Sequence, residues 1–280
     1  MKIATIARNP ENSPNMTTND AAILECVTQE LISQGNEVVA ISGTDKIPDG
    51  TEVICHMSRS AEVLNKLESA EERGIAVVNS SAAVRNCSRA AQMHILEESA
   101  IPQPFFRIIT NEEELSGLPF PAWIKRSNGW SCHKDDVAFS TCREEAVTVF
   151  ENMRQRGIES VVYTQHCEGD IVKFYGIGEK YFTYSYPNAD GTKFGLERIN
   201  GKAKHYPFDT TAMAKMAAKA AKAVGLEIYG GDCIVDANGK FCLIDLNDFP
   251  SFSSVRNEAA KEIARIIMNI KKRYQDERRG

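Results

Sequence analysis

The sequence predicts a mixed α/β fold with a parallel sheet in its N-terminal part. Apolar stretches of strand length alternate with stretches of helical periodicity from residue 2 to residue 79, and this alternation is typical of parallel strands joined by helices. Beyond Gly169 the apolar stretches follow one another closely, so the chain becomes rich in strands. The 280 residues, 42% of them hydrophobic, are enough to bury a core without disulfides or metals.

The first expected elements end at recognisable signals. We expect strands at 2–7, 37–42, 52–57 and 75–79, and helices at 19–34 and 61–73. In the first helix Ile23, Val27 and Leu31 recur at helical spacing. Gly35 and Gly74 follow the two helices, at positions where glycine commonly ends a helix. The turn after the first strand lacks the G-x-G-x-x-G pattern, so the sequence does not favour a dinucleotide site there.

The remaining elements alternate less regularly. A helix at 88–99 runs into Pro102 and Pro104, which force an extended exit. We then expect strands at 122–126, 137–140, 160–164, 171–177, 181–186, 194–199, 227–235 and 240–247, and helices at 143–156, 212–224 and 253–274. Gly225 ends the helix before it, which is rich in alanine and lysine.

Charge and cysteine content restrict the partners and the compartment. The 33 Lys and Arg against 38 Asp and Glu give a net charge of -5, which provides no overall attraction to nucleic acid or an anionic membrane. No apolar run reaches the about 18 residues that a membrane-spanning helix needs. The eight cysteines are scattered without a C-x-x-C pair, as in reduced proteins. We therefore expect a cytoplasmic protein with no nucleic-acid or membrane partner.

A segment near the C-terminus predicts a β-hairpin that carries carboxylates. Asn238-Gly239 between two apolar runs indicates a two-residue turn. Counting outward from this turn places Asp232 opposite Asp245, and alternation along the strand places Asn247 on the same face. Oxygen donors of this kind suit Mg²⁺, which completes its coordination with phosphate and water. The alternative is an edge of a sheet with solvated carboxylates.

Two lysines interrupt apolar strands upstream of this hairpin. Lys125 lies one residue before the end of the strand 122–126, and Lys173 lies inside the strand 171–177. A lysine in a buried strand is unfavourable unless an anion pairs with it, so the two lysines and the acidic hairpin together favour a phosphate site. Either lysine could instead extend to the edge of its sheet.

Several short motifs occur in a fixed order along the chain. They are Asn79, Asn86-Cys87-Ser88-Arg89 at the start of a helix, Ile101-Pro102-Gln103-Pro104, Ile124-Lys125-Arg126, the stretch from Gln165 to Tyr175, and Asp245-Leu246-Asn247-Asp248-Phe249-Pro250-Ser251-Phe252. This series resembles the ATP-grasp superfamily, and in particular its glutathione-synthetase and ribosomal-modification ligases. The resemblance implies a Rossmann-like N-terminal domain at 1–84, a small ATP-grasp subdomain at 85–164 and a large subdomain with the metal site at 165–280.

The resemblance also implies that ATP and two Mg²⁺ ions bind between the two subdomains. The metal ligands would be Asp232, Asp245 and Asn247. The residues that would bind the nucleotide are Lys125 and Lys173 at the phosphates, Gln165, His166, Cys167 and Glu168 at the adenine, and Asp170 at the ribose. Lys125, Arg198 and Arg256 would be the catalytic cations. Without the resemblance, Arg198 reads as a surface strand residue, Arg256 as the start of a helix, and His133 and His166 as structural histidines.

The reaction implied by the resemblance is the ATP-dependent joining of a carboxylate to an amine or a thiol through an acyl phosphate. The partners would be a small-molecule or peptide carboxylate and an amine acceptor near Arg8, Arg59 and Arg256, with the protein as a homodimer. Two alternatives stay open. The Asp-x-Asn-x-Phe-Pro ending also resembles inositol-phosphate kinases of this fold, and the protein could bind nucleotide without catalysis. The loop 126–136 has a single glycine, Gly129, so its closure over the phosphates is a separate question.

Overall fold

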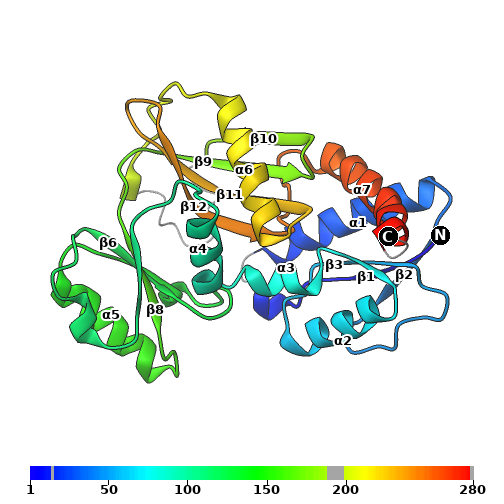
Figure 1. The fold of residues 1–280 in the computed structure, drawn as a ribbon, viewed down its shortest axis with the longest axis horizontal. Coiled ribbons are helices and arrows are strands. Elements are labelled where there is room, and N and C mark those ends of the chain that lie inside the picture. The colour runs from blue at the N-terminus through cyan, green and yellow to red at the C-terminus, as the bar shows by residue number, and fades with distance from the viewer. Residues whose placement is uncertain (14–15, 188–198, 278–280) are drawn as a thin grey trace.

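The computed structural model describes residues 1–13, 16–187 and 199–277, and their side chains as far as residue 270. Within those ranges the strands form three sheets of four strands each, which lie in three regions of the molecule (Figure 1). The mixed α/β class predicted from the sequence is therefore confirmed. Of the described helices, none is both long enough and apolar enough to cross a membrane.

The N-terminal sheet is parallel, with the strand order β2-β1-β3-β4. Its strands are β1 (Lys2–Ile6), β2 (Glu37–Ile41), β3 (Val53–His56) and β4 (Ala76–Val78), and its helices are α1 (Thr17–Ser33), α2 (Ala61–Glu72) and α7 (Arg256–Glu277). Because side chains alternate along a strand, Ile3 and Val53 pack with α1 and α7 on one face. Ala4 and Ile54 pack with α2 on the other face. Both faces of the sheet are thus covered, as its apolar strands require.

The last helix, α7, belongs to the core of this first sheet. Ile263 and Ile267 of α7 are fully buried, and they share one cluster with Ile23 and Leu31 of α1. In Figure 1 α7 lies beside α1, and the N- and C-terminal ends lie on the same side of the molecule. The expected division of the chain at residues 84 and 164 assigns α7 to the large subdomain, whereas its apolar side chains pack against the N-terminal sheet.

The small sheet is antiparallel, with the strand order β5-β8-β6-β7. Its elements are β5 (Phe106–Ile109), β6 (Ala122–Arg126), β7 (Val137–Ser140), α5 (Arg143–Gln155) and β8 (Val161–Gln165). Ile124 and Tyr163 of the sheet pack with Phe150 of α5. The sequence did not predict β5, because a four-residue strand that includes the exposed Arg107 shows no apolar period. The helix α3 (Ser81–Asn86) was also not predicted, because its six residues are too few to show a helical period.

The large sheet is also antiparallel, with the strand order β10-β9-β11-β12. Its strands are β9 (Asp170–Ile177), β10 (Tyr181–Ser185), β11 (Ile228–Val235) and β12 (Phe241–Asp248). The helices α4 (Arg89–Glu98) and α6 (Thr210–Val224) cover one face, where Leu96 and Ala217 share a cluster with Phe174 and Leu246. The strand expected at 194–199 falls almost entirely on residues 188–198, which lie outside the described residues.

Strands β11 and β12 form the predicted hairpin, but with a different turn. The Asp236 N–H donates to the Lys240 carbonyl at 2.9 Å, and this bond closes a loop of three residues. Gly239 ends the loop with a φ of +76°, a conformation that favours glycine and is common in three-residue hairpin loops. The predicted two-residue turn is therefore wrong. The ladder begins with Val235 opposite Phe241, one residue away from the predicted register.

A β-bulge on β12 restores the predicted register at the carboxylates. Cys233 faces Leu243, but the next residue along β11, Asp232, faces Asp245. Ile244 is thus the extra residue of the bulge. The predicted pairing of the two aspartates is confirmed, although it results from a longer turn and a bulge that cancel each other.

Candidate active site

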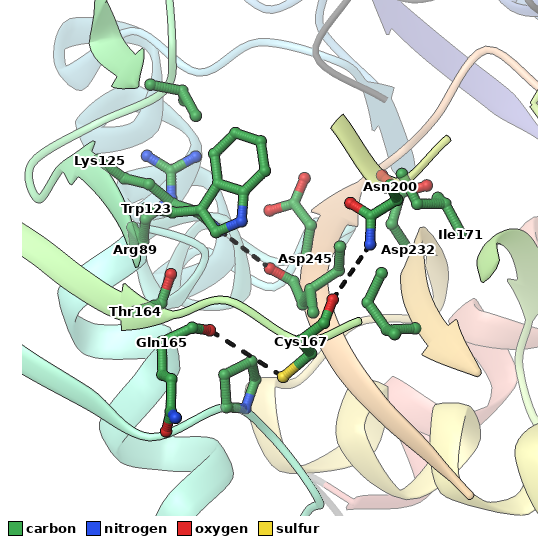
Figure 2. Close-up of a pocket in the computed structure, with 14 residues that line it drawn as sticks. Arg89, Trp123, Lys125, Thr164, Gln165, Cys167, Ile171, Asn200, Asp232 and Asp245 are labelled. Atoms are coloured by element: carbon green, nitrogen blue, oxygen red, sulfur yellow. Dashed lines mark hydrogen bonds between the residues drawn. The ribbon is translucent and has the colours of Figure 1, made fainter. Parts of the chain in front are cut away.

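Two adjoining cavities lie between the sheets, and we call them the hinge cavity and the central cavity. The hinge cavity, ≈ 170 Å³, lies between the small and the large sheet (Figure 2), and its lining includes Pro104, Trp123, Lys125, Gln165, Cys167, Ile171, Asn200, Ile234 and Ile244. The central cavity, ≈ 350 Å³, extends to the N-terminal sheet, and its lining includes Arg8, Asp20, Arg59, Trp130, Lys173, Asn247 and Asp248. Arg89, Val137, Asp232 and Asp245 line both cavities, so the two adjoin at these side chains.

The hinge cavity has apolar walls and a polar rim. The walls come from both sheets and from the segment before β5: Pro104, Trp123, Val137, Ile171, Ile234 and Ile244. At the rim, Asn200 Nδ2 donates to the Cys167 carbonyl at 3.1 Å and to the Gly169 carbonyl at 3.3 Å. Trp123 Nε1 donates to His166 Nδ1 at 3.1 Å. A narrow apolar cavity with polar groups at its edge suits a flat heteroaromatic ring.

Lys125 lines the hinge cavity close to Arg89, Asp232 and Asp245, which line both cavities. Its Nζ donates to the carbonyl of Ile244, the bulge residue, at 3.5 Å. Burial and the nearby Arg89 lower the pKa of Lys125 to about 8, although Asp245 and Asp232 partly oppose this shift. Figure 2 shows Lys125 and Arg89 across the cavity from the two aspartates. This end of the hinge cavity therefore presents cations and carboxylates to the same space.

The predicted metal ligands lie together in the central cavity. Asp232 and Asp245 are directly opposite each other on β11 and β12, and Asn247 Nδ2 donates to Asp245 Oδ2 at 2.9 Å. Lys173 lies opposite Asp232 on β9, and its Nζ is 3.0 Å from Asp232 Oδ1. Burial by itself raises the pKa of Asp245, but Arg89 and Lys125 outweigh it and hold that pKa below its usual range.

This donor set fits Mg²⁺. Two ionised carboxylates and an amide oxygen are hard ligands, and Mg²⁺ commonly takes few protein ligands and keeps waters or phosphate oxygens. Among the described residues there is no group of three or more His, Cys, Asp or Glu side chains that could hold a metal ion. The site therefore has two carboxylates, on adjacent strands, rather than a complete cage of protein ligands.

The four residues predicted to lie at the adenine separate into two pairs. Gln165 and Cys167 line the hinge cavity. A hydrogen bond with Cys242 and the charge of Lys125 lower the pKa of the Cys167 thiol to about 7, although burial partly opposes this. His166 and Glu168 instead line another cavity, of ≈ 390 Å³, which shares Asn200 with the hinge cavity. The backbone alternates direction along this extended segment, which explains the separation.

Asp170 has a different environment from the predicted one. Its side chain is buried, with Oδ1 accepting from the Lys204 N–H at 2.7 Å and Oδ2 from the Tyr206 N–H at 2.9 Å. Both carboxylate oxygens are thus bonded to the backbone of the segment before α6. Asp170 lies in the lining of the cavity of His166 and Glu168, and not of the hinge cavity. The structure therefore does not support the predicted contact with the ribose.

The predicted cations near the acceptor are also arranged differently. Arg8 and Arg59 line the central cavity, but both pair with the buried Asp248, at 3.3 Å and 2.5 Å. Arg256 begins α7, donates to Asn19 Oδ1 at 3.1 Å, and is not in the lining of either cavity. Arg198 lies outside the described residues.

Arg89 is a site residue to which the sequence analysis assigned no role. It lines both cavities, and its Nη1 donates to the Arg126 carbonyl at 2.8 Å. Burial lowers its pKa, while Asp245 and Asp136 oppose this. Arg89 is the first residue of α4, where a cation opposes the helix dipole. That local conflict is the signal that could have indicated a binding role.

The chain resembles known proteins in sequence and in structure. No family model matches it. A protein of Pasteurella multocida described as a probable alpha-L-glutamate ligase is 22% identical over 276 residues, which cover 95% of this chain and 82% of that protein. The RimK domain ATP-grasp protein of Sphaerobacter thermophilus superposes with a TM-score of 0.70 at 16% identity, covering 96% of this chain and 100% of that one.

Two D-alanine–D-alanine ligases superpose equally well. The enzyme of Bacillus anthracis, in complex with ATP, has a TM-score of 0.74 at 15% identity and covers 99% of each chain. The enzyme of Coxiella burnetii has a TM-score of 0.74 at 12% identity, covering 100% of this chain and 97% of that one. These superpositions span the three sheets and confirm the resemblance found in the motifs. The chain therefore has the fold of the ATP-grasp superfamily.

Proposed function

We propose that this protein is an ATP-dependent ligase that joins a carboxylate to an amine through an acyl phosphate. The observation that carries the proposal is the pairing of Asp232 with Asp245, with Asn247 beside them and Lys125 and Lys173 in reach of the same space. The sequence relative is described as a probable ligase, and one superposed ligase was solved with ATP. Both support the proposal.

In this proposal the hinge cavity holds the adenine ring and the central cavity holds the phosphates. Ile171, Ile234 and Ile244 supply apolar contacts to the ring. The triphosphate then passes Lys125 and Arg89 and reaches Lys173 at the centre of the large sheet. Positive side chains on both sides of a partly buried path neutralise phosphate charge where solvent screens it least.

Asp232, Asp245 and Asn247 would hold two Mg²⁺ ions at the phosphate end. When bound, Mg²⁺ would neutralise charge on the phosphoryl group during transfer. Lys173 is already 3.0 Å from Asp232, so it stays next to the metal ligands and can also contact a phosphate oxygen. The lysine thereby keeps the two carboxylates from repelling each other before nucleotide binds.

The reaction needs positioning and charge neutralisation more than a protein nucleophile. A substrate carboxylate oxygen attacks the γ-phosphorus of ATP, and ADP leaves. The amine nitrogen then attacks the acyl carbon, phosphate leaves, and the amine gives up a proton. In both steps negative charge would build up near Lys125 of the hinge cavity, Lys173 of the central cavity and Arg89, which lines both.

The proposal is tested by phosphate release from Mg-ATP with pairs of carboxylates and amines, L-glutamate among them. We expect release that depends on the amine, and we expect Asp245→Asn to reduce it by roughly 100-fold or more while the thermal unfolding profile is kept. Asp49→Asn, at a side chain that is 93% exposed, is the matched control. Wild-type turnover by Asp245→Asn would reject the metal assignment. A stable phosphorylated product formed without an amine would identify a kinase instead.

A further inference from the structure

The loop 127–136 between β6 and β7 reaches across the central cavity to the N-terminal sheet. Gly129, Trp130 and Ser131 line that cavity. The indole of Trp130 packs against the apolar cluster of the N-terminal sheet and also against the cluster of the large sheet. The tip of this loop therefore contacts two regions of the molecule other than the small sheet that carries it.

The base of the loop is fixed within the small subdomain. Asp136 is fully buried, accepts from the Cys132 N–H at 2.8 Å and the His133 N–H at 2.9 Å, and pairs with Arg156. Ser127 Oγ donates to the Ser160 carbonyl at 2.7 Å. These bonds hold both ends of the loop. At the tip, Arg89 Nη2 donates to Ser131 Oγ at 3.3 Å, and the contacts of Trp130 are the second set that fixes the tip.

The polar partner of Trp130 is Arg59, on the segment between β3 and α2. The Arg59 Cζ lies 5.1 Å from the centroid of the indole ring, within the range of a cation–π interaction. Trp130 Nε1 is buried and has no hydrogen-bond partner in the described part of the chain. The indole is thus held through its ring face and its apolar packing rather than through its N–H.

One edge of the Arg59 guanidinium is bonded to Asp248 of β12. Arg59 Nε donates to Asp248 Oδ1 at 2.7 Å, and both side chains are nearly inaccessible to solvent, with 6% and 1% exposed. Asp248 directly follows Asn247, one of the proposed metal ligands. A planar guanidinium that binds a carboxylate through one edge can still present its face to an aromatic ring. Arg59 therefore connects the tip of the loop to the strand that carries Asp245 and Asn247.

We propose that Arg59 is a positioning residue that acts through Trp130 and keeps the loop 127–136 over the phosphate end of the central cavity. In a loop with a single glycine, this contact replaces the backbone adaptability of a glycine-rich loop. Since the inference rests on the proposed ligase function, the covered cavity would exclude water while the acyl phosphate waits for the amine. Without Arg59, water would attack the acyl phosphate, returning the carboxylate and releasing phosphate.

Arg59→Lys and Trp130→Leu separate this role from folding. Lysine keeps a charge beside Asp248 but loses the planar face, and leucine keeps apolar bulk but loses the ring. Trp130→Phe keeps a ring and loses no hydrogen bond, because Nε1 has no partner in the described part of the chain. Arg107→Lys is the matched control, since Arg107 lies 5.4 Å from the Phe105 ring on the outer side of the small sheet.

The first readout is trypsin cleavage after Lys134, an exposed residue of the loop, with a non-hydrolysable ATP analogue bound. This measurement needs no catalysis. We expect Arg59→Lys and Trp130→Leu to be cleaved roughly tenfold faster than wild type, the loss expected for a partly buried cation–π pair. Trp130→Phe and Arg107→Lys should match wild type. The double variant Arg59→Lys/Trp130→Leu should be cleaved no faster than the worse single variant, because one contact cannot be lost twice.

The second readout is the ratio of phosphate released to ligated product. Arg59→Lys and Trp130→Leu should raise this ratio. Trp130→Phe should leave it at the wild-type value. Wild-type cleavage rates in Arg59→Lys, or additive effects in the double variant, would overturn the inference. A protein without ligase activity would reject the proposed function, while the cleavage pattern would still decide the role of Arg59.

Discussion

The charge state of Lys125 is set by its place between two sheets. Lys125 lies next to the end of β6, and its side chain has Arg89, Asp232 and Asp245 nearby. Burial and the Arg89 cation lower its pKa, whereas the two carboxylates raise it. The net result is a pKa of about 8 instead of the ordinary 10.5. A lysine with such a pKa is protonated at neutral pH but loses its proton under mildly alkaline conditions.

We therefore expect the affinity for ATP to fall as the pH rises through about 8. Bound phosphate favours the protonated lysine, so nucleotide binding should take up a proton near pH 8.5, and loss of the charge should weaken binding about tenfold. Titration calorimetry in buffers of different ionisation enthalpy measures both effects. In Lys125→Arg the cation cannot titrate, so the fall in affinity through pH 8 should disappear. An affinity that is flat from pH 7 to pH 9 in the wild type would contradict this placement.

At the scale of elements, the bulge in β12 shapes the site more than the turn of the hairpin does. Because Ile244 is the extra residue, Ile244 and Asp245 both line the hinge cavity although they are neighbours on a strand. The Ile244 carbonyl also accepts a hydrogen bond from Lys125 Nζ at 3.5 Å. One irregularity thus supplies an apolar contact, a carboxylate and a lysine acceptor at the same point.

Ile244→Ala should weaken nucleotide binding without removing a charged group. Losing most of an aliphatic contact with the ring corresponds to roughly a tenfold increase in Kd, and the Mg²⁺ dependence of binding should not change. Fluorescence titration with an ATP analogue measures the affinity. Ile32→Ala, at a side chain of α1 that is 46% exposed, should bind as wild type does. An unchanged Kd in Ile244→Ala would show that the adenine ring does not bind in the hinge cavity.

The elements also show what the sequence could and could not predict. Counting outward from a two-residue turn placed Asp232 opposite Asp245, and this pairing is correct only because the longer turn and the bulge cancel each other. The bulge was not predictable, since no residue in Leu243-Ile244-Asp245 signals an extra position. The role of Asp170 was not predictable either, because its partners are backbone amides of residues more than thirty positions away. Arg8 and Arg59 could be predicted as site residues, but not as partners of one buried Asp248.

At the scale of the whole molecule, a network of buried charges joins the N-terminal sheet to the large sheet. Arg8 pairs with Asp20 and Asp248, and Arg59 pairs with Asp248. Burial by itself raises the pKa of Asp248, but Arg59 and Arg8 outweigh it and hold that pKa below 3.8. Burial and the nearby Arg59 lower the pKa of Arg8 to about 10. Arg8 and Asp248 are therefore both ionised at neutral pH.

Asp248→Asn should destabilise the protein by about 3–5 kcal/mol at neutral pH, because it leaves buried arginines without a partner. A carboxylate whose pKa is lowered by folding contributes stability above its ordinary pKa, and this contribution is lost as the pH falls through the folded value. The difference between variant and wild type should thus be constant above about pH 4 and shrink below it. Urea unfolding at several pH values measures this. Glu37→Gln, which breaks the exposed pair with Lys2, should change stability by less than about 1 kcal/mol.

The packing of α7 on the first sheet has a consequence for synthesis of the protein. Ile3 and Val53 need α7 as well as α1 to cover their face of the sheet, yet α7 follows α6 in the chain and is translated long after the strands that it covers. The nascent N-terminal part must therefore wait, with an apolar face uncovered, until most of the chain has been translated. A truncated product that stops before α7 would expose this face to chaperones and proteases.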